Sequence, residues 1–190
     1  MQPICRENLC IGLGCSDQNA QCYVNQEDED MAKAYITKKH CVIEILSYVC
    51  LVASIIIAIV GMAILPDEIA THFDGAGNID GYGSPGVLLM LPLIMLFSNG
   101  VMSMVLHLMS PEAWNTPCKI EPGREVLVYR DVSSMITWME LEFGVFTLAM
   151  TIASWQQNGK LLMIETIVFM ILLTIVVVYG IVACIIHSKR

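Results

Sequence analysis

Residues 65–85 read L-P-D-E-I-A-T-H-F-D-G-A-G-N-I-D-G-Y-G-S-P and lie between two long apolar runs. Pro66 lacks a backbone N–H and restricts the residue before it, so we expect it to end the preceding helix. Asn78 and Asp80 favour tight turns, and glycine allows the positive φ that such turns need. Positive φ is expected at four glycines, Gly75, Gly77, Gly81 and Gly83. The stretch therefore predicts a compact Gly/Asp-rich loop between two helices.

The composition of the chain is that of an integral membrane protein. Hydrophobic residues make up 56% of its 190 residues, charged residues make up 15%, and the mean hydropathy is +0.65. An ordinary soluble domain carries about 25% charged residues. The net charge of −8 also argues against a nucleic-acid partner, because nucleic-acid binding requires a basic face.

Four apolar spans are long enough to cross a bilayer, whose hydrocarbon layer of about 30 Å requires about 20 residues. We place the helices at about 41–65, 87–109, 133–155 and 161–186. The third span contains Glu140 and Glu142 but must still cross, because residues 143–155 alone are too short. We therefore predict an all-α, four-transmembrane-helix bundle that occupies residues 41–190.

The basic residues flanking these helices predict the orientation of the chain. Lysine and arginine are enriched in cytoplasmic segments of membrane proteins. Three groups are expected on one side: Lys33, Lys38 and Lys39; Lys119, Arg124 and Arg130; Lys189 and Arg190. The other side carries only Lys160. Both termini are therefore predicted to be cytoplasmic, and the loop at 65–85 to be extracytoplasmic.

Residues 1–40 are polar and lack the features of a secretory signal peptide. Their four cysteines are Cys5, Cys10, Cys15 and Cys22. The spacing C-x4-C-x4-C-x6-C lacks the C-x2-C knuckle of usual zinc sites, so metal binding is the alternative to the disordered cytoplasmic tail that we predict. A disulfide framework is not expected in a reducing compartment. Met31 could also be the natural first residue of the protein, because a short basic segment and the first helix follow it.

Small and polar residues inside the predicted helices recur in steps of three and four, which places them on one face of each helix. The three stripes are Ser47, Cys50, Ser54, Ala58 and Gly61; Asn99, Ser103 and His107; and Thr137, Glu140, Gly144, Thr147, Thr151 and Ser154. Two interpretations stay open: the packed interior of a bundle, or a solute pathway.

Glu140 is the strongest intramembrane candidate, because an ionisable residue in a membrane is costly and suggests function. If Trp138 and Trp155 mark the two interfaces, Glu140 lies within about one turn of the inner boundary. His107 falls at a similar depth, so we predict that His107 and Glu140 pair, as an interior contact or a proton-sensitive latch. Glu44 and Glu165 are expected to reach the lipid headgroups.

The loop carries a written motif in Pro66, His72, Phe73, Asp74, Gly77, Asp80 and Gly83. With its flanks at about 52–96, it resembles the bacterial membrane family called domain of unknown function 1648, and departs from that pattern at Ala70 and Pro85. The relatives of this family include SdpI-like proteins. The resemblance implies a multi-pass protein of the bacterial plasma membrane that confers immunity to a toxin or takes part in signalling. Besides the lipid bilayer, its implied partners are a peptide toxin or a cytoplasmic regulator.

Catalytic motifs are absent from the sequence, which has no nucleophile elbow, no H-E-x-x-H and no phosphate-binding glycine loop. A looser metal site at His72, Asp74 and Asp80 competes with turn capping by the same carboxylates. We therefore predict a protein that is not an enzyme and carries no cofactor. The alternative is a small transporter or channel component that uses the polar stripe around Glu140, and a metal-dependent membrane enzyme ranks last.

Overall fold

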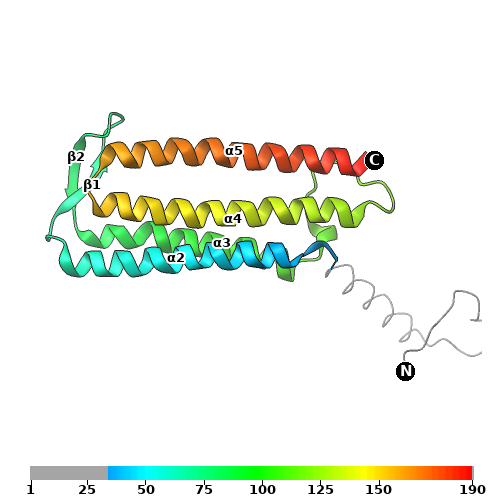
Figure 1. Cartoon of the computed structure of the whole chain (residues 1–190), viewed down its shortest axis with the longest axis horizontal. Helices are drawn as coiled ribbons and strands as arrows, with labels where there is room; N and C mark the ends of the chain where they lie inside the picture. The colour runs from blue at the N-terminus through cyan, green and yellow to red at the C-terminus, as the bar shows by residue number, and fades with distance from the viewer. Residues whose placement is uncertain (1–33, 190) are drawn as a thin grey trace, which may run out of the picture.

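The computed structural model describes residues 34–189, in which four long helices run side by side (Figure 1). The helices are α2 (Lys38–Ile64), α3 (Met90–Leu108), α4 (Glu125–Trp155) and α5 (Gly159–Lys189). Four helical segments are long and apolar enough to cross a membrane. In this count, α3 is taken together with the short helix η1 (Pro85–Leu89) that precedes it. This confirms the predicted all-α fold with four transmembrane helices. The tail cysteines Cys5, Cys10, Cys15 and Cys22 lie outside the described residues.

Successive helices run in opposite directions, so the bundle has two distinct ends (Figure 1). At the hairpin end, α2 leads into a two-stranded hairpin and a short turn joins α4 to α5. At the terminal end lie the start of α2, the connection from α3 to α4 with its short helix η2 (Pro111–Ala113), and the C-terminus.

The predicted loop at 65–85 contains regular structure. Strands β1 (Ile69–Phe73) and β2 (Ile79–Gly83) pair antiparallel, with Ile69 opposite Gly83 and Phe73 opposite Ile79. The sequence contains the signal for this hairpin, because two short runs rich in β-branched and aromatic residues flank a D-G-A-G-N turn. Pro66 acts as predicted: α2 ends at Ile64, and Leu65 is extended, with φ −79° and ψ 157°.

The glycines of this stretch serve different purposes from those predicted. Within residues 65–85, Gly77 alone has positive φ, at 80°. Gly81 and Gly83 lie in β2, where a Cβ on Gly81 would come 3.0 Å from the Cβ of His72, and one on Gly83 would come 3.1 Å from the Oγ1 of Thr71. They are needed because the two strands approach closely, which residue spacing alone does not reveal.

Helix α4 is central, since it packs against α2, α3 and α5. It begins at Glu125 instead of the predicted 133, because Val128, Tyr129 and Val132 are buried and extend the helix beyond its apolar span. The other ends differ less: α2 begins at Lys38, α3 is preceded by η1, and α5 continues to Lys189.

An aromatic cluster closes the terminal end of the bundle. Tyr35, Trp114 and Tyr129 pack edge to face, with ring centroids 5.4–6.0 Å apart. Tyr35 is only 2% exposed, so the last part of the predicted tail is packed against the membrane domain. This burial, together with neighbouring Tyr129, raises the pKa of the Tyr35 hydroxyl above its usual value.

Candidate functional site

The small and polar stripes predicted on α2 and α4 form the interior of the bundle. Ser47, Ser54, Ala58 and Gly61 are buried on α2. The buried residues of α4 include Thr137, Glu140, Gly144, Thr147 and Thr151. Helical periodicity therefore identified the inward faces correctly.

Helices α2 and α4 approach closely at Gly144, where a Cβ would lie 2.7 Å from the backbone oxygen of Ser47. The Ser47 hydroxyl donates a hydrogen bond to the backbone oxygen of Glu140. Asn99 of α3 donates from Nδ2 to Ser47 Oγ at 2.7 Å and to the same Glu140 oxygen at 3.1 Å. These hydrogen bonds thus join three helices, and they depend on the absence of a side chain at Gly144.

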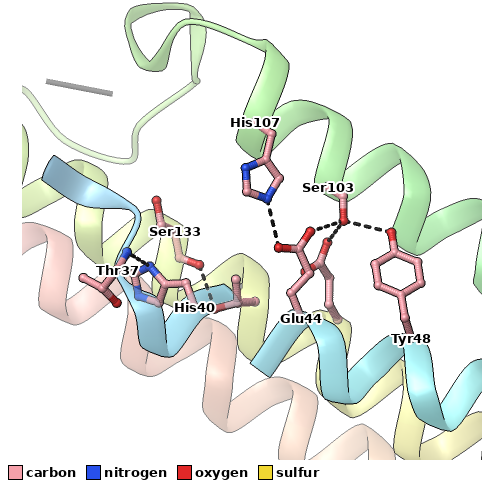
Figure 2. A network of polar contacts seen from close by, with 9 residues as sticks. Thr37, His40, Glu44, Tyr48, Ser103, His107 and Ser133 are labelled. Atoms are coloured by element: carbon pink, nitrogen blue, oxygen red, sulfur yellow. Dashed lines mark hydrogen bonds and ion pairs between the residues drawn. The ribbon is translucent and has the colours of Figure 1, made fainter. Parts of the chain in front are cut away.

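The Glu140 carboxyl lies beside these hydrogen bonds and is fully buried. Its Oε1 is 3.0 Å from the hydroxyl of Ser103 on α3. The same hydroxyl is 2.6 Å from Oε1 of Glu44 and 2.9 Å from the hydroxyl of Tyr48, both on α2 (Figure 2). Ser103 therefore bridges two carboxyl groups.

The predicted pairing of His107 with Glu140 is wrong. His107 Nε2 lies 2.9 Å from Oε2 of Glu44 (Figure 2). His107 and Ser103 are one turn apart on α3 and both face α2, so Glu44 reaches each of them. With a side chain 13% exposed, Glu44 faces the bundle and does not extend to the headgroups. The overlooked signal was its place three residues before Ser47, on the same stripe.

Glu140 also lies deeper than predicted. It is midway between Glu125 and Trp155, the two ends of α4, and its backbone oxygen bonds to Asn99, which is midway along α3. Trp138 is two residues before Glu140 and so also lies near the middle of α4, which makes it a poor marker of the interface.

Two oxygen atoms in this region lack hydrogen-bond partners. Within residues 34–189, Oε2 of Glu140 and Oδ1 of Asn99 are buried and make no hydrogen bond. A buried acceptor without a donor is costly. The cluster can therefore accept at least one further donor.

At the hairpin end, the motif residue Phe73 fastens the hairpin to α5. A Cβ on Gly159 would collide with the ring of Phe73, and one on Gly77 would come 2.9 Å from the backbone nitrogen of Lys160. The backbone of Ala70 donates to Oε1 of Gln157 in the turn between α4 and α5, at 2.5 Å. The hairpin is thus seated on the ends of the helices.

The polar residues of the motif bond within the hairpin. Oδ1 of Asp74 accepts from the backbone nitrogens of Ala76 (2.9 Å) and Asn78 (2.8 Å), and its Oδ2 accepts from Asn78 Nδ2 (2.9 Å). The bond from the Asn78 side chain contributes most, and together with the backbone bonds it lowers the pKa of Asp74. His72 pairs instead with Asp80, and both side chains are exposed.

Metal binding was the competing interpretation of the loop. In the part of the chain that the structure describes, no group of three or more His, Cys, Asp or Glu residues is placed to hold a metal ion. Asp74 instead caps the hairpin turn with both carboxyl oxygens.

A cavity of about 270 Å³ lies between the hairpin and the nearby helix ends. Strand β1, η1 and the adjoining parts of α3, α4 and α5 line it with mostly apolar side chains. Its polar lining consists of the hydroxyls of Thr71, Thr151 and Ser154 and the imidazole of His72. At the same end of the bundle, the hairpin segment exposes four carboxylates, those of Asp67, Glu68, Asp74 and Asp80.

Comparison with known families bears on this end of the molecule. Residues 49–96 match the family model described as Domain of unknown function (DUF1648). The segment is a DUF1648 domain. This confirms the predicted resemblance to the family, whereas its SdpI-like relatives stay an expectation. The chain matches no curated protein and no solved structure.

The DUF1648 segment contains one of the two candidate sites, the hairpin end, and none of the intramembrane cluster. It contains the end of α2, the whole hairpin, η1 and the start of α3, and hence every residue of the written motif. Glu44, Ser103, His107 and Glu140 all lie outside it. The family match therefore concerns the hairpin end, and the intramembrane cluster must be interpreted from its geometry.

Proposed function

We propose that this chain is a non-enzymatic protein of the bacterial plasma membrane that recognises a cationic, membrane-active peptide, in an immunity or signalling role. In this proposal the hairpin end faces outside and both termini are cytoplasmic, as the distribution of basic residues favours. The observation that supports it best is the presence of exposed carboxylates and a mostly apolar cavity at the same end of the bundle.

The charge of the hairpin end suits a cationic ligand. Residues 65–85 contain no lysine or arginine. Hydrogen bonds lower the pKa of Asp74, which keeps this carboxylate charged well into the acidic range. Clustered charges of one sign attract oppositely charged ligands and raise their rate of association.

The cavity suits the apolar side of the same ligand. An amphipathic helix lies in the membrane interface with its charged face toward water and its apolar face inward. The hairpin rests on the ends of helices that are long enough to cross the bilayer, which favours a cavity near the membrane interface, where such a peptide binds. A large apolar side chain could enter the cavity while lysines of the peptide meet the carboxylates.

A binding experiment with a defined probe tests this proposal. The probe is a fluorescent amphipathic helix of leucine and lysine, added to the protein in phosphatidylcholine nanodiscs at low salt. The variant Asp67→Asn/Glu68→Gln should bind roughly threefold to tenfold more weakly, since each exposed charge contributes up to about 1 kcal/mol. The control Glu112→Gln/Glu121→Gln removes the same charge at the terminal end and should bind like the unmodified protein.

Two outcomes would count against peptide recognition: equal weakening in both variants, or unchanged binding in both. The alternative, a small transporter or channel component, would then be favoured. The observation on its side is Glu140, fully buried between three helices with one carboxyl oxygen that has no partner within residues 34–189.

A further inference from the structure

The hydroxyl of Ser103 makes more contacts than its own proton can supply. It lies within hydrogen-bond distance of Tyr48, Glu44 and Glu140, at 2.9, 2.6 and 3.0 Å. A serine hydroxyl donates one hydrogen bond and accepts up to two. Two of its three neighbours must therefore donate to it. Tyr48 is one such donor, and the other must be a carboxyl group.

Counting protons over the whole cluster gives the same result. With both carboxylates ionised, the protons available are those of Tyr48, Ser103 and Nε2 of His107. The contacts number one more than these protons, because His107 also bonds to Glu44 at 2.9 Å. A carboxyl proton completes the set. The polar groups that face Glu140 are Glu44 from α2, and Ser103 and His107 from α3.

The surroundings of the two carboxyls decide which one holds this proton. Glu44 accepts from both Ser103 and His107, which stabilises its charged form. Glu140 is fully buried, and within residues 34–189 the Ser103 hydroxyl is the one partner of its carboxyl group. An ionised carboxylate in such a position is costly. The proton belongs on Glu140, which donates it to Ser103, while Ser103 donates to Glu44.

We propose that Glu140 is a proton-binding site in the membrane domain and that Ser103 and Glu44 connect its proton to water near the terminal end. The exposed fractions of the side chains fall from 39% at His107 to 13% at Glu44, and Glu140 is fully buried. The site therefore opens toward one end of the bundle. This inference holds whether the protein recognises a peptide or transports a solute.

The transfer is a concerted shift of two protons. Glu140 gives its proton to Ser103 Oγ, while Ser103 gives its own proton to Oε1 of Glu44. Two O–H bonds break and two form, so Ser103 is unchanged and the negative charge moves from Glu44 to Glu140. Glu44 then exchanges its proton with water beside His107. His107 is a positioning residue in this scheme, since it holds the Glu44 carboxylate in place.

Infrared difference spectroscopy on the full-length protein in nanodiscs tests the location of the proton. Glu140→Gln should remove one C=O stretching band of a protonated carboxylic acid, while Glu44→Gln should retain that band at a shifted frequency. Subtraction of the spectrum of the unmodified protein cancels the other carboxyl groups. If Glu140→Gln leaves the band intact, or if Glu44→Gln alone removes it, the assignment to Glu140 is overturned.

The path is tested by exchange of the same band in heavy water. Ser103→Ala should keep the band but slow its exchange by a factor on the order of 100, the lower end of what a positioned proton-transfer group contributes. The matched control is Ser98→Ala on the same helix, because Ser98 donates to the backbone oxygen of Ile94. Exchange in Ser103→Ala as fast as in Ser98→Ala would overturn the path.

Discussion

The two faces of α4 are packed in different ways. Toward α2 and α3, it presents small and polar residues, a backbone contact at Gly144 and hydrogen bonds to Ser47 and Asn99. Toward α5, the rings of Phe146 and Phe169 stack with centroids 4.1 Å apart beside a cavity of about 470 Å³. Glu142 and Glu165 line that cavity, and within residues 34–189 they carry buried oxygens without hydrogen-bond partners.

This difference shows where the bundle is specified most strongly. In a bilayer, apolar side chains gain little by leaving lipid for protein, so helices associate through close packing and hydrogen bonds. Along its middle, the face of α4 toward α2 has both, while the face toward α5 has aromatic stacking and a cavity. Nearer the terminal end, α5 does approach α4 closely at Gly180, and its His187 bonds to Asp131 at 2.6 Å. We therefore expect α2, α3 and α4 to form the stable unit of the fold, and α5 to be held less tightly around the cavity.

The largest expected effect comes from adding a methyl group at the close contact. Gly144→Ala places a Cβ 2.7 Å from a backbone oxygen, which cannot move without shifting α2, so the free energy of unfolding should fall by about 1–3 kcal/mol. The control is Gly100→Ala on α3, where a Cβ would meet nothing within 4 Å in the described structure. Unfolding titrations in detergent measure both, and equal effects would show that the close contact contributes nothing special.

A smaller effect of opposite sign is expected on the other face. Glu142→Leu removes a carboxyl group that has no hydrogen-bond partner within residues 34–189, so the free energy of unfolding should rise by about 1 kcal/mol. Glu140→Leu, two residues earlier, removes a bond to Ser103 and should lower it. The same titrations apply. Loss of stability in Glu142→Leu would mean that the Glu142 carboxyl is hydrogen-bonded in the folded protein.

The smallest effect is expected where the polar contacts are in water. The pKa of Asp74 lies below its ordinary value of 3.8 because Asn78 and Ala76 donate to the charged form. The carboxylate therefore stabilises the turn above that ordinary value, and this contribution is lost as the pH falls through the lowered pKa. Amide exchange at Ala76 and Asn78 should speed up only below about pH 4, apart from its intrinsic pH dependence. Asp74→Ala should exchange fast throughout, whereas Asp67→Ala should behave as the unmodified chain.

The main features of the fold followed from local sequence. Four uninterrupted apolar spans determined four membrane helices, because every backbone polar group in lipid must bond within its own helix or barrel. Steps of three and four residues determined the inward faces of α2 and α4, since helical geometry is the same in any context. Pro66 ended α2 for an equally local reason, the loss of an N–H group.

The partners across the bundle were decided by tertiary structure. Periodicity places His107, Glu44 and Glu140 on inward faces but does not give the depth or rotation of one helix against another. Glu44 therefore takes His107, and Ser103 bridges the two carboxyls. Likewise, the sequence marked Asp74 and Gly77 as turn residues, yet the seating of Phe73 on Gly159 depends on where α5 begins in space. Contacts between segments far apart in the chain need the whole arrangement of helices, which no short stretch of sequence contains.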